Sequence, residues 1–553
     1  MATEMHPPVW KNSSQTLTAH PDQFVQVASA DALVSAVQAA VDSEKKIRVT
    51  GGHHSWYPLV MSDKEPDGGS LPGSEFVMID VSQMKAITKE EDGHGGYLVH
   101  AEPGATMGDL EAATMGNWPD APAPPPLVAL TTNGVIPTEL QLGGFVSAGC
   151  HGTGWEQPTV PDLVEAIEIV VVDKNGKAAL RKFTAAYAEE MAAVRVHLGT
   201  IGAIARITFR AVALYSIHGI DDVKQPMPQV VSRTPSPSDH PLKNLVENND
   251  YVELFWFPFN ATKLENPANA LDLSDLRMVP DMEDTRVWVK TGNVVPNVDG
   301  APAPPKNVPS QGWDALASKF GSWAYTEVAK KLSGGVIDYG LAEGLLWSSN
   351  HAAYKSAAAN FVAPATRFFH YQKSAFPVLD LSMAVPMDAE TDPFYETISK
   401  AWYAAVDAIV DWARTKEEYY QRFPVNVTLH ARFTKNSQSL LSPAYQPEGS
   451  DVHTCWIEFV SGAPTPDAPG ESWYDNYMST WAAFCREVGK TWLDLGGRPH
   501  WAKEWQLLEP EGVYDRLPEL YGSNLSKFKT IRDELDPTET FLFPWTAKIF
   551  GQS

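Results

Sequence analysis

The sequence is poor in cysteine, in basic residues and in long apolar runs, and each shortage excludes a class of protein. Its 553 residues include three cysteines and no Cys-x-x-Cys pair, which excludes a disulfide framework and a cysteine-ligated metal site. The net charge of −25 disfavours nucleic acid and anionic membranes as partners, because their phosphates would be repelled. The sequence has no run of about 18 apolar residues, so no membrane span is predicted. Residues 1–16 lack the basic and then apolar segments of a signal peptide. We therefore expect a cytoplasmic protein with no nucleic-acid and no membrane partner.

The composition that is present is typical of a globular chain with more than one domain. With 44% hydrophobic and 20% charged residues the sequence is too apolar to be disordered, and it is too long for one hydrophobic core. The spacing of apolar residues predicts a helix over 29–42. Strands are predicted from β-type runs at 47–49, 76–80, 97–101, 164–172 and 205–212.

The composition changes from about residue 215. Proline-rich linkers are predicted at 226–241 and 296–309. The pattern predicts long helices over 313–332 and 393–416, and strands over 251–257, 286–291, 424–433 and 454–459. This mixture indicates an α+β domain with an antiparallel sheet.

A short stretch after the strand 47–49 carries two glycines and two histidines: Thr50-Gly51-Gly52-His53-His54-Ser55-Trp56. Glycines directly after a strand let the backbone turn tightly and approach a ligand closely. A histidine on such a turn can react with whatever lies against it. Histidines in a glycine turn can equally be ordinary hydrogen-bonded residues, so this interpretation depends on the motifs that follow.

Three further glycine-rich segments lie in the same part of the chain. They are 102–106 around Gly104, 141–154 with Gly143-Gly144 and His151-Gly152-Thr153-Gly154, and 198–204. Exposed N–H groups in such segments can cradle a pyrophosphate, and small residues can wrap a flat ligand. No Gly-x-Gly-x-x-Gly follows a first strand, so the pattern is not that of a Rossmann domain.

In this order the motifs resemble the vanillyl-alcohol-oxidase (PCMH-type) FAD oxidoreductases. The similar branch contains sugar-1,4-lactone oxidases, alditol oxidases and covalent-flavin cholesterol oxidases. The resemblance implies FAD bonded through its 8α-methyl group to His54, with His53 as the less favoured neighbour, and no second bond at Cys150. It implies further cofactor contacts from Gly51, Gly52, His53, Ser55, Gly104, Gly143, Gly144, Gly149, His151, Gly152, Gly154, Gly202 and Ile204.

The segment 423–432, followed by 441–445, resembles the active-site strand of this branch. The relatives have Glu-x-Arg, and this chain has His430-x-Arg432. Residues two apart on a strand point to the same side. Arg432 can therefore bind an oxyanion or carboxylate, while His430 either accepts the substrate's hydroxyl proton or only shapes the pocket.

Two more residues are identified as catalytic from the resemblance. Lys503 lies in a His-Trp-x-Lys pattern and would place a cation at the flavin and the substrate oxygen, although a solvated lysine is the usual case. Glu253 lies in an apolar strand and resembles a cap-domain glutamate of the cholesterol-oxidising relatives, although a surface position is also open. The segment 536–550 resembles the family's closing segment, with Phe543 where asparagine is common.

The sequence as a whole predicts an α+β protein. A PCMH-type FAD-binding domain would span 16–215, an α+β substrate (cap) domain 216–503, and a segment returning to the FAD domain 504–553. The expected activity is oxidation of a carbinol in a polyol, sugar lactone or other small hydroxylated substrate by hydride transfer to FAD, with no metal. Oxygen as acceptor would give H2O2. Val135 is bulky at the presumed oxygen-gating position, which leaves open a dehydrogenase with another acceptor, or a ligand-binding relative without turnover.

Overall fold

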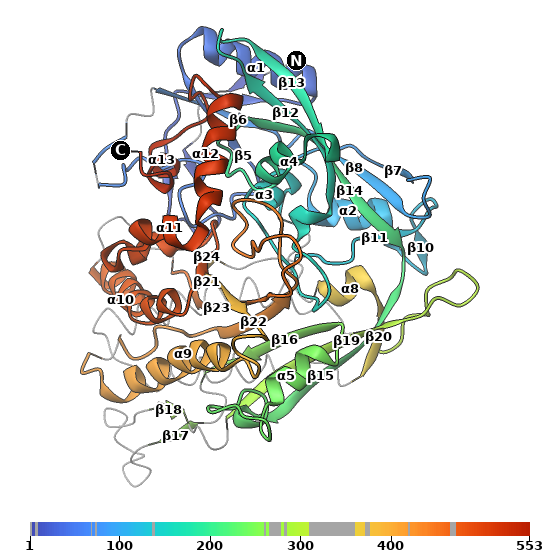
Figure 1. The fold of residues 1–553 in the computed structure, drawn as a ribbon. Helices are drawn as coiled ribbons and strands as arrows, with labels where there is room; N and C mark the ends of the chain where they lie inside the picture. Colours follow the sequence, from blue (N-terminus) through green and yellow to red (C-terminus); the bar gives the residue numbers. More distant parts are fainter. Residues whose placement is uncertain are drawn as a thin grey trace.

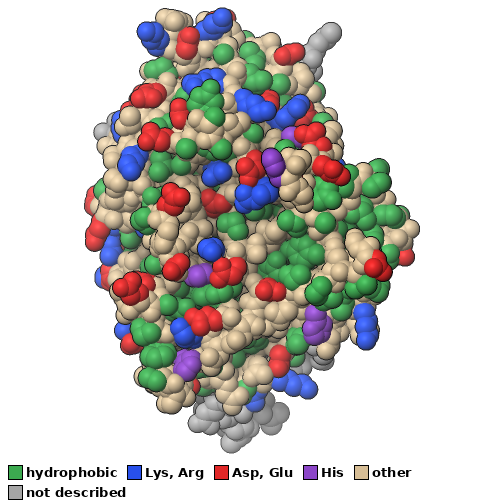
Figure 2. All heavy atoms as spheres, turned by 45° about the vertical axis from the view of Figure 1, so that its right-hand side comes forward, with side chains coloured by type: hydrophobic (Ala, Val, Ile, Leu, Met, Phe, Trp, Pro, Cys, Tyr) green, Lys and Arg blue, Asp and Glu red, His purple; other side chains and the backbone are tan. Residues whose placement is uncertain are grey.

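Three sheets, two of them in the N-terminal part, organise the chain (Figure 1). The computed structural model describes residues 3–5, 9–67, 69–71, 75–134, 139–258, 262–264, 278–280, 285–308, 360–370, 377–418, 421–464 and 472–552. In the described part, no helix is long and apolar enough to cross a membrane. Figure 2 shows acidic and basic side chains interspersed over one face, so the net negative charge is spread there and does not form one patch.

The first sheet has the order β1-β4-β6-β5, with β4 and β5 both parallel to β6. Helix α1 packs against it through Leu33 and Val37, which are fully buried. Ser29 caps this helix, because its hydroxyl accepts a hydrogen bond from the backbone N–H of Ala32 at 3.2 Å. The elements are β1 (Thr3–Met5), β4 (Gln23–Gln26), α1 (Ala30–Asp42), β5 (Lys46–Thr50) and β6 (Phe76–Asp80).

The second sheet has the order β13-β12-β14-β8-β7, with β11 paired to β14. Thr106 begins the helix that follows β8 with a reciprocal capping box to Asp109. The elements here are β7 (Ile87–Glu91), β8 (Tyr97–Ala101), α2 (Met107–Thr114), β9 (Gly116–Asn117), β10 (Ala121–Pro122), β11 (Val128–Ala129), α3 (Leu142–Ser147), β12 (Val164–Val172), β13 (Ala178–Thr184), α4 (Ala188–Val194) and β14 (Ala203–Ala213).

The third sheet is antiparallel throughout and has the order β20-β15-β19-β16-β22-β23-β21-β24. Helices α9 and α10 contact its strands and each other. Its elements are β15 (Ser216–Pro226), α5 (Pro241–Glu247), β16 (Tyr251–Trp256), β19 (Arg286–Val295), β20 (Phe361–Pro364), α8 (Ala365–Phe369), β21 (Val378–Met387), α9 (Glu396–Thr415), β22 (Thr428–Thr434), β23 (His453–Gly462), α10 (Ser472–Asp494) and β24 (Arg498–Pro499).

The C-terminal residues run back to the first sheet. The backbone N–H of Ile47 on β5 donates to the carbonyl of Thr540 at 2.9 Å. Figure 1 shows α12 and α13 beside the N-terminal half of the molecule, in red against blue and teal. The elements are η9 (Trp505–Glu511), α11 (Val513–Tyr521), α12 (Ser523–Leu535) and α13 (Pro544–Ile549).

The predicted fold class is confirmed: the molecule mixes helices with sheets and has a large antiparallel sheet in its second half. Two predictions differ in detail. Residues 142–147, expected in a glycine-rich wrapping segment, form the short helix α3, and the strand expected over 424–433 begins only at Thr428. Prolines and glycines make such boundaries hard to place from sequence. The helix predicted over 313–332 and the oxygen-gating Val135 lie outside the described residues.

Candidate active site

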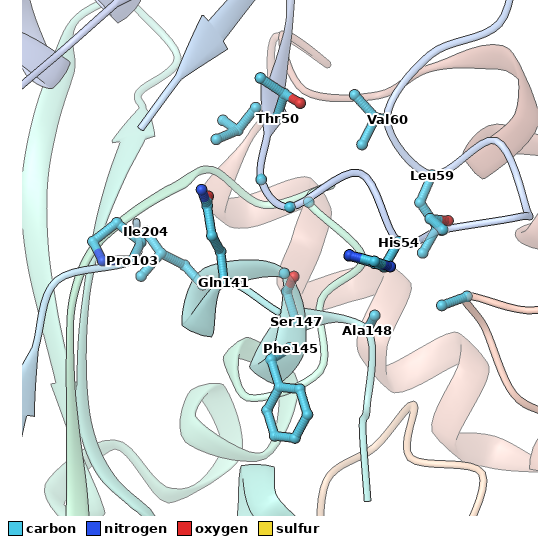
Figure 3. A pocket seen from close by; sticks show the side chains of 18 of the residues that line it. Thr50, His54, Leu59, Val60, Pro103, Gln141, Phe145, Ser147, Ala148 and Ile204 are labelled. Carbon is cyan, nitrogen blue, oxygen red and sulfur yellow. The ribbon is translucent and has the colours of Figure 1, made fainter. Parts of the chain in front are cut away.

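A cavity lies between the first two sheets and the C-terminal half of the chain, and its empty space, including the part open to solvent, is about 940 Å³. Its wall comes from the end of β5 and the loop after it, from Pro103, from α3, from the turn 197–199 and from the start of β14. Figure 3 shows Gln141, Phe145 and Ser147 on and beside α3, and His54 on the loop after β5. Segments far apart in sequence thus form one binding wall.

The two histidines of the predicted attachment loop have different surroundings. His54 lies near Ser13, with 3.3 Å from its Nδ1 to the hydroxyl, and near Glu139, with 3.3 Å from its Nε2 to the carboxylate. The His53 ring turns away to the carbonyl of Lys11 and the Trp10 ring. The φ angle of His53 is +62°, a left-handed conformation that non-glycine residues rarely adopt. The rings of His53 and His54 therefore lie against different partners, although both residues line the cavity.

The predicted cofactor residues fall into two groups. One group lines the cavity: Gly51, Gly52, His53, His54, Ser55, Gly143, Gly144, Gly202 and Ile204. The other group does not line it and serves turns or close packing instead: Gly104, Gly149, His151, Gly152 and Gly154. A Cβ on Gly104 would lie 2.0 Å from the carbonyl oxygen of Val81, so that glycine is required by packing alone.

The cavity wall has the properties needed to hold a flat, phosphorylated cofactor. Gly144 is exposed on it, and a Cβ there would meet no protein atom within 4 Å. At Gly52, by contrast, a Cβ would lie 2.3 Å from the carbonyl oxygen of Glu139, so the loop can pass this close only as glycine. The side-chain oxygen of Gln141 is buried without a hydrogen-bond partner among the described residues. An unpaired acceptor and a bare backbone on one wall fit FAD.

Sequence reasoning missed two polar residues in this wall, Arg48 and His197. Arg48 is buried and donates to the carbonyls of Val60 and Gly199, each at 3.0 Å, and to that of Phe541 at 2.6 Å. Burial lowers its pKa to about 10. The available signal was an arginine inside the apolar run of β5, but its meaning depends on partners some 150 and 493 positions away.

A second cluster lies on the third sheet, where β22 places His430 and Arg432 on one side. Both reach the same carboxylate: His430 Nδ1 lies 2.8 Å, and an Arg432 guanidinium nitrogen 3.1 Å, from Glu458 Oε1. Glu458 sits opposite His430 on β23. Burial raises the pKa of Glu458. The positive charges of Arg432 and Lys503 and a hydrogen bond from His430 outweigh burial and hold that pKa well below its usual range. Sequence reasoning did not find Glu458, despite its place in an apolar strand.

Glu253 joins this cluster from β16, so its side chain is buried and does not face solvent. Its Oε2 lies 3.5 Å from Nε2 of His430, and neither atom makes a hydrogen bond within the described residues. Burial raises the pKa of Glu253, but His430 and nearby cations outweigh it and leave that pKa below its ordinary value. His430 therefore lies between two carboxylates, of which the sequence had identified Glu253 but not Glu458.

Lys503 is held by carboxylates from the same sheet. Its ammonium pairs closely with Asp380 on β21, lies 4.0 Å from Glu458 Oε2 and sits 4.4 Å from the centre of the Trp56 ring. Burial lowers the pKa of Lys503, but Asp380 and Glu458 reverse that effect and raise it. Burial raises the pKa of Asp380 to about 6, so this carboxyl is still ionised at neutral pH. Lys503 is thus a fixed cation at neutral pH.

The cluster and the cavity adjoin each other. Cys150 and Ala502 line the cavity, and Ala502 directly precedes Lys503. Burial raises the pKa of Cys150 to about 11 against the opposing fields of Lys503 and Arg432, so its thiol stays neutral. The backbone N–H of Trp56 donates to the carbonyl of Ala502 at 2.7 Å, which ties the histidine loop to the segment that carries Lys503.

Two histidines near the place where the cluster adjoins the cavity, His151 and His500, pack against other rings. His151 stacks on Trp456 with 3.7 Å between ring centres and 7° between planes. His500 lies 5.6 Å from the His151 ring. Burial lowers the pKa of His500 to about 3 and that of His151 well below its usual range, so both rings are neutral.

Phe543, in the place of the family's asparagine, is fully buried against Phe76, with 5.4 Å between ring centres in an edge-on arrangement. It belongs to a hydrophobic cluster with Trp10 and Met78. It does not line the cavity.

The arrangement combines a cavity for a flat phosphorylated cofactor with an adjoining set of fixed cations and a hydrogen-bonded imidazole. Cations stabilise negative charge that develops on an oxygen. An imidazole held through one ring nitrogen can accept a proton on the other. Within the described residues, no group of histidine, cysteine, aspartate and glutamate side chains could hold a metal ion.

Comparison with known proteins agrees with this arrangement. A family model described as an FAD binding domain matches residues 21–178, and one described as D-arabinono-1,4-lactone oxidase matches residues 318–549. The L-gulonolactone oxidase of Scyliorhinus torazame is 23% identical over 552 residues, covering 98% of this chain and 98% of that protein. The L-gulono-1,4-lactone dehydrogenase of Mycobacterium tuberculosis is 21% identical over 544 residues, covering 98% and 99%.

Among solved structures, a cholesterol oxidase from B. sterolicum shares the fold. The TM-score is 0.72 at 15% identity, with 99% of this chain and 97% of that chain covered. The two family models follow one another along the chain, the FAD binding domain first and the D-arabinono-1,4-lactone oxidase domain second. The chain therefore combines an FAD binding domain with a D-arabinono-1,4-lactone oxidase domain, and in both it resembles the vanillyl-alcohol-oxidase (PCMH-type) FAD oxidoreductases.

Proposed function

We propose that this FAD-dependent oxidoreductase oxidises a carbinol carbon of a sugar-1,4-lactone or a similar small polyhydroxylated molecule, with FAD bonded covalently to His54 and O2 as the acceptor. The observation that carries the proposal is the meeting of Arg432, Lys503 and His430 at Glu458, next to the cavity that His54 lines. The relatives named as L-gulonolactone oxidase and D-arabinono-1,4-lactone oxidase support the substrate class.

When bound, FAD supplies an acceptor for the hydride of the carbinol carbon. The residues that would hold it are His54 and the cavity wall at Gly51, Gly144, Gln141 and Ile204. Attachment through His54 is supported by its position on that wall, with the His53 ring turned away to Lys11. His54 would bond through a ring nitrogen to the flavin's methyl carbon.

Arg432 and Lys503 would stabilise the negative charge that develops on the substrate oxygen. Both cations are held by buried carboxylates, so they need little reorganisation when the charge appears. The donor at Nδ1 of His430 is engaged by Glu458, which leaves Nε2 to take the hydroxyl proton. Glu253, 3.5 Å from Nε2, would then stabilise the imidazolium.

The function is tested by anaerobic titration of the purified yellow protein. A panel of L-gulono-1,4-lactone, D-arabinono-1,4-lactone, alditols, sterols and aromatic alcohols is added while the flavin absorption is recorded. Bleaching by a lactone or alditol is the expected result. Bleaching by sterols alone would overturn the substrate class.

A dehydrogenase that uses another electron acceptor is the second candidate. It is favoured by the bulky Val135 and by the relative named as L-gulono-1,4-lactone dehydrogenase. Peroxide formation in air is compared with reduction of an artificial dye. Stoichiometric peroxide supports the oxidase, whereas a reduced flavin that persists in air while the dye turns over supports the dehydrogenase.

The covalent bond is tested by acid denaturation and gel electrophoresis of the native chain, His54→Ala and the matched control His53→Ala. Flavin fluorescence should stay with the protein in the native chain and in His53→Ala, and disappear in His54→Ala. Fluorescence retained in His54→Ala would rule out this attachment site.

A further inference from the structure

The imidazole of His197 is buried in the cavity wall, and its two ring nitrogens distinguish it from the other polar groups there. His197 is 1% exposed and lines the cavity. Both ring nitrogens, Nδ1 and Nε2, lack a partner among the described residues. Its carbonyl, in contrast, accepts from the N–H and the hydroxyl of Thr200, at 2.9 and 2.7 Å. The backbone is therefore fixed, and only the ring is left unsatisfied.

A buried polar ring without partners is costly, and burial lowers the pKa of His197 to about 3, so the ring cannot escape that cost by charging. The neutral imidazole has one N–H donor and one acceptor. Since the protein around it supplies no partner in the described part of the chain, the partner must come from the cavity. His197 is unusual in this respect, because buried polar groups are nearly always paired.

The field at this position favours an anionic oxygen. Arg48, whose charge contributes to the field at His197, donates to the carbonyls of Gly199 and Leu198, at 3.0 and 3.3 Å, within the same turn as His197. The guanidinium of Arg48 donates its five hydrogens to the carbonyls of Leu59, Val60, Leu198, Gly199 and Phe541. These contacts are to neutral groups, so Arg48 can act on a ligand through its positive charge but not through a further hydrogen bond. That charge and the neutral N–H donor of His197 on the same wall together match a phosphate oxygen.

We infer that His197 donates a hydrogen bond from its ring to a pyrophosphate oxygen of FAD, with Arg48 providing the complementary charge. This role is separate from the glycine motifs, which act through backbone groups, and from the attachment at His54. The inference rests on FAD as the cofactor but not on covalent attachment or on a particular substrate.

The test uses the full-length chain with His54→Ala, which makes FAD binding reversible under the proposed attachment. His197→Phe in this background should weaken FAD binding by about 10- to 100-fold, the usual effect of losing a hydrogen bond to a charged group. His197→Gln keeps a donor and an acceptor and should recover most of the affinity. His100→Phe is the matched control, because His100 lies on β8 outside the cavity with its own partners Thr208 and Glu90.

Two readouts separate this contact from a structural role. The flavin-free His197→Phe chain should be at least as heat-stable as its parent, because the change removes two unpaired polar atoms. In FAD-loaded samples, the 31P resonances of the pyrophosphate should move in His197→Gln while the visible flavin spectrum stays the same.

Unchanged FAD affinity in His197→Phe would overturn the inference. So would a loss of stability in the flavin-free chain, or a shifted flavin spectrum with unmoved 31P resonances, which would place the contact at the ring system. Failure of the native chain, with His54 in place, to bind FAD would instead refute the cofactor assignment.

Discussion

Glu504 offers the clearest test of the buried electrostatics beside Lys503. Its Oε2 accepts hydrogen bonds from the backbone N–H of Asp380 at 2.9 Å and from the indole of Trp481 at 3.1 Å. Burial nevertheless raises the pKa of Glu504 to about 8, against an ordinary value of 4.5. The folded protein thus keeps a proton on this carboxyl at neutral pH that the unfolded chain would release.

The sign of the effect follows from that proton. Between pH 4.5 and about 8 the folded state binds more protons at Glu504 than the unfolded state does, so stability falls as pH rises. The shift corresponds to about 5 kcal/mol at and above pH 8, at about 1.4 kcal/mol for each pKa unit. Glu504→Gln imitates the protonated acid and can accept the same two hydrogen bonds. It should therefore remove most of this destabilisation.

Urea unfolding of the native chain and of Glu504→Gln at pH 5, 7 and 8.5 measures the difference. The variant should be little changed at pH 5 and more stable by several kcal/mol at pH 8.5. Glu519→Gln, at an exposed position of α11, should show no pH-dependent difference. Equal stability of Glu504→Gln and the native chain at pH 8.5 would refute the reasoning, as would a gain of the same size at pH 5.

Three further predictions concern the cluster at Glu458. Glu458→Gln should lower stability by about 3–5 kcal/mol at neutral pH, because it removes the buried carboxylate charge that pairs with Arg432 and His430. The pKa of Glu458 is depressed in the folded state, so the stability lost in Glu458→Gln should shrink as pH falls below the ordinary glutamate range. Urea unfolding measures this, and a stability loss that does not change with pH would contradict it. Arg432→Met and Lys503→Met should each slow flavin reduction by about 10²–10³-fold, measured by anaerobic stopped flow at unchanged flavin content. Near-normal rates in both variants would show that the active site has been assigned to the wrong residues. His430→Gln should slow flavin reduction, because the amide cannot accept the hydroxyl proton, and His430→Glu should restore part of the rate; a normal rate in His430→Gln would leave His430 a binding residue.

Much of the cofactor side could be predicted from the sequence because its information is local. A strand and a glycine turn follow one another within a few residues, as at Gly51 and His54. The fold class followed from the same motifs and from the strand patterns of the second half. His430 and Arg432 could be placed on one side because alternation along a strand needs no tertiary knowledge.

The remaining residues of the site depend on contacts between distant segments. Glu458 matters because β22 and β23 pair in a register that sets it opposite His430. Asp380 meets Lys503 because β24 pairs with β21. Register between strands is set by the whole core and cannot be deduced from one strand's own pattern. The position of His197 was also hidden in the sequence. The residues on either side of it in the sequence do not show that its ring nitrogens find no hydrogen-bond partner among the described residues.

The return of the C-terminus to β5 has a consequence for synthesis of the protein. Ile47 and Arg48 bind the carbonyls of Thr540 and Phe541, which lie 493 positions further along the chain. Domains tend to fold from the N-terminus as the chain emerges, but here the wall beside the histidine loop is complete only after residue 541 has been made. A chain that stops before Phe541 would emerge with every glycine motif intact, yet with the Arg48 guanidinium short of an acceptor.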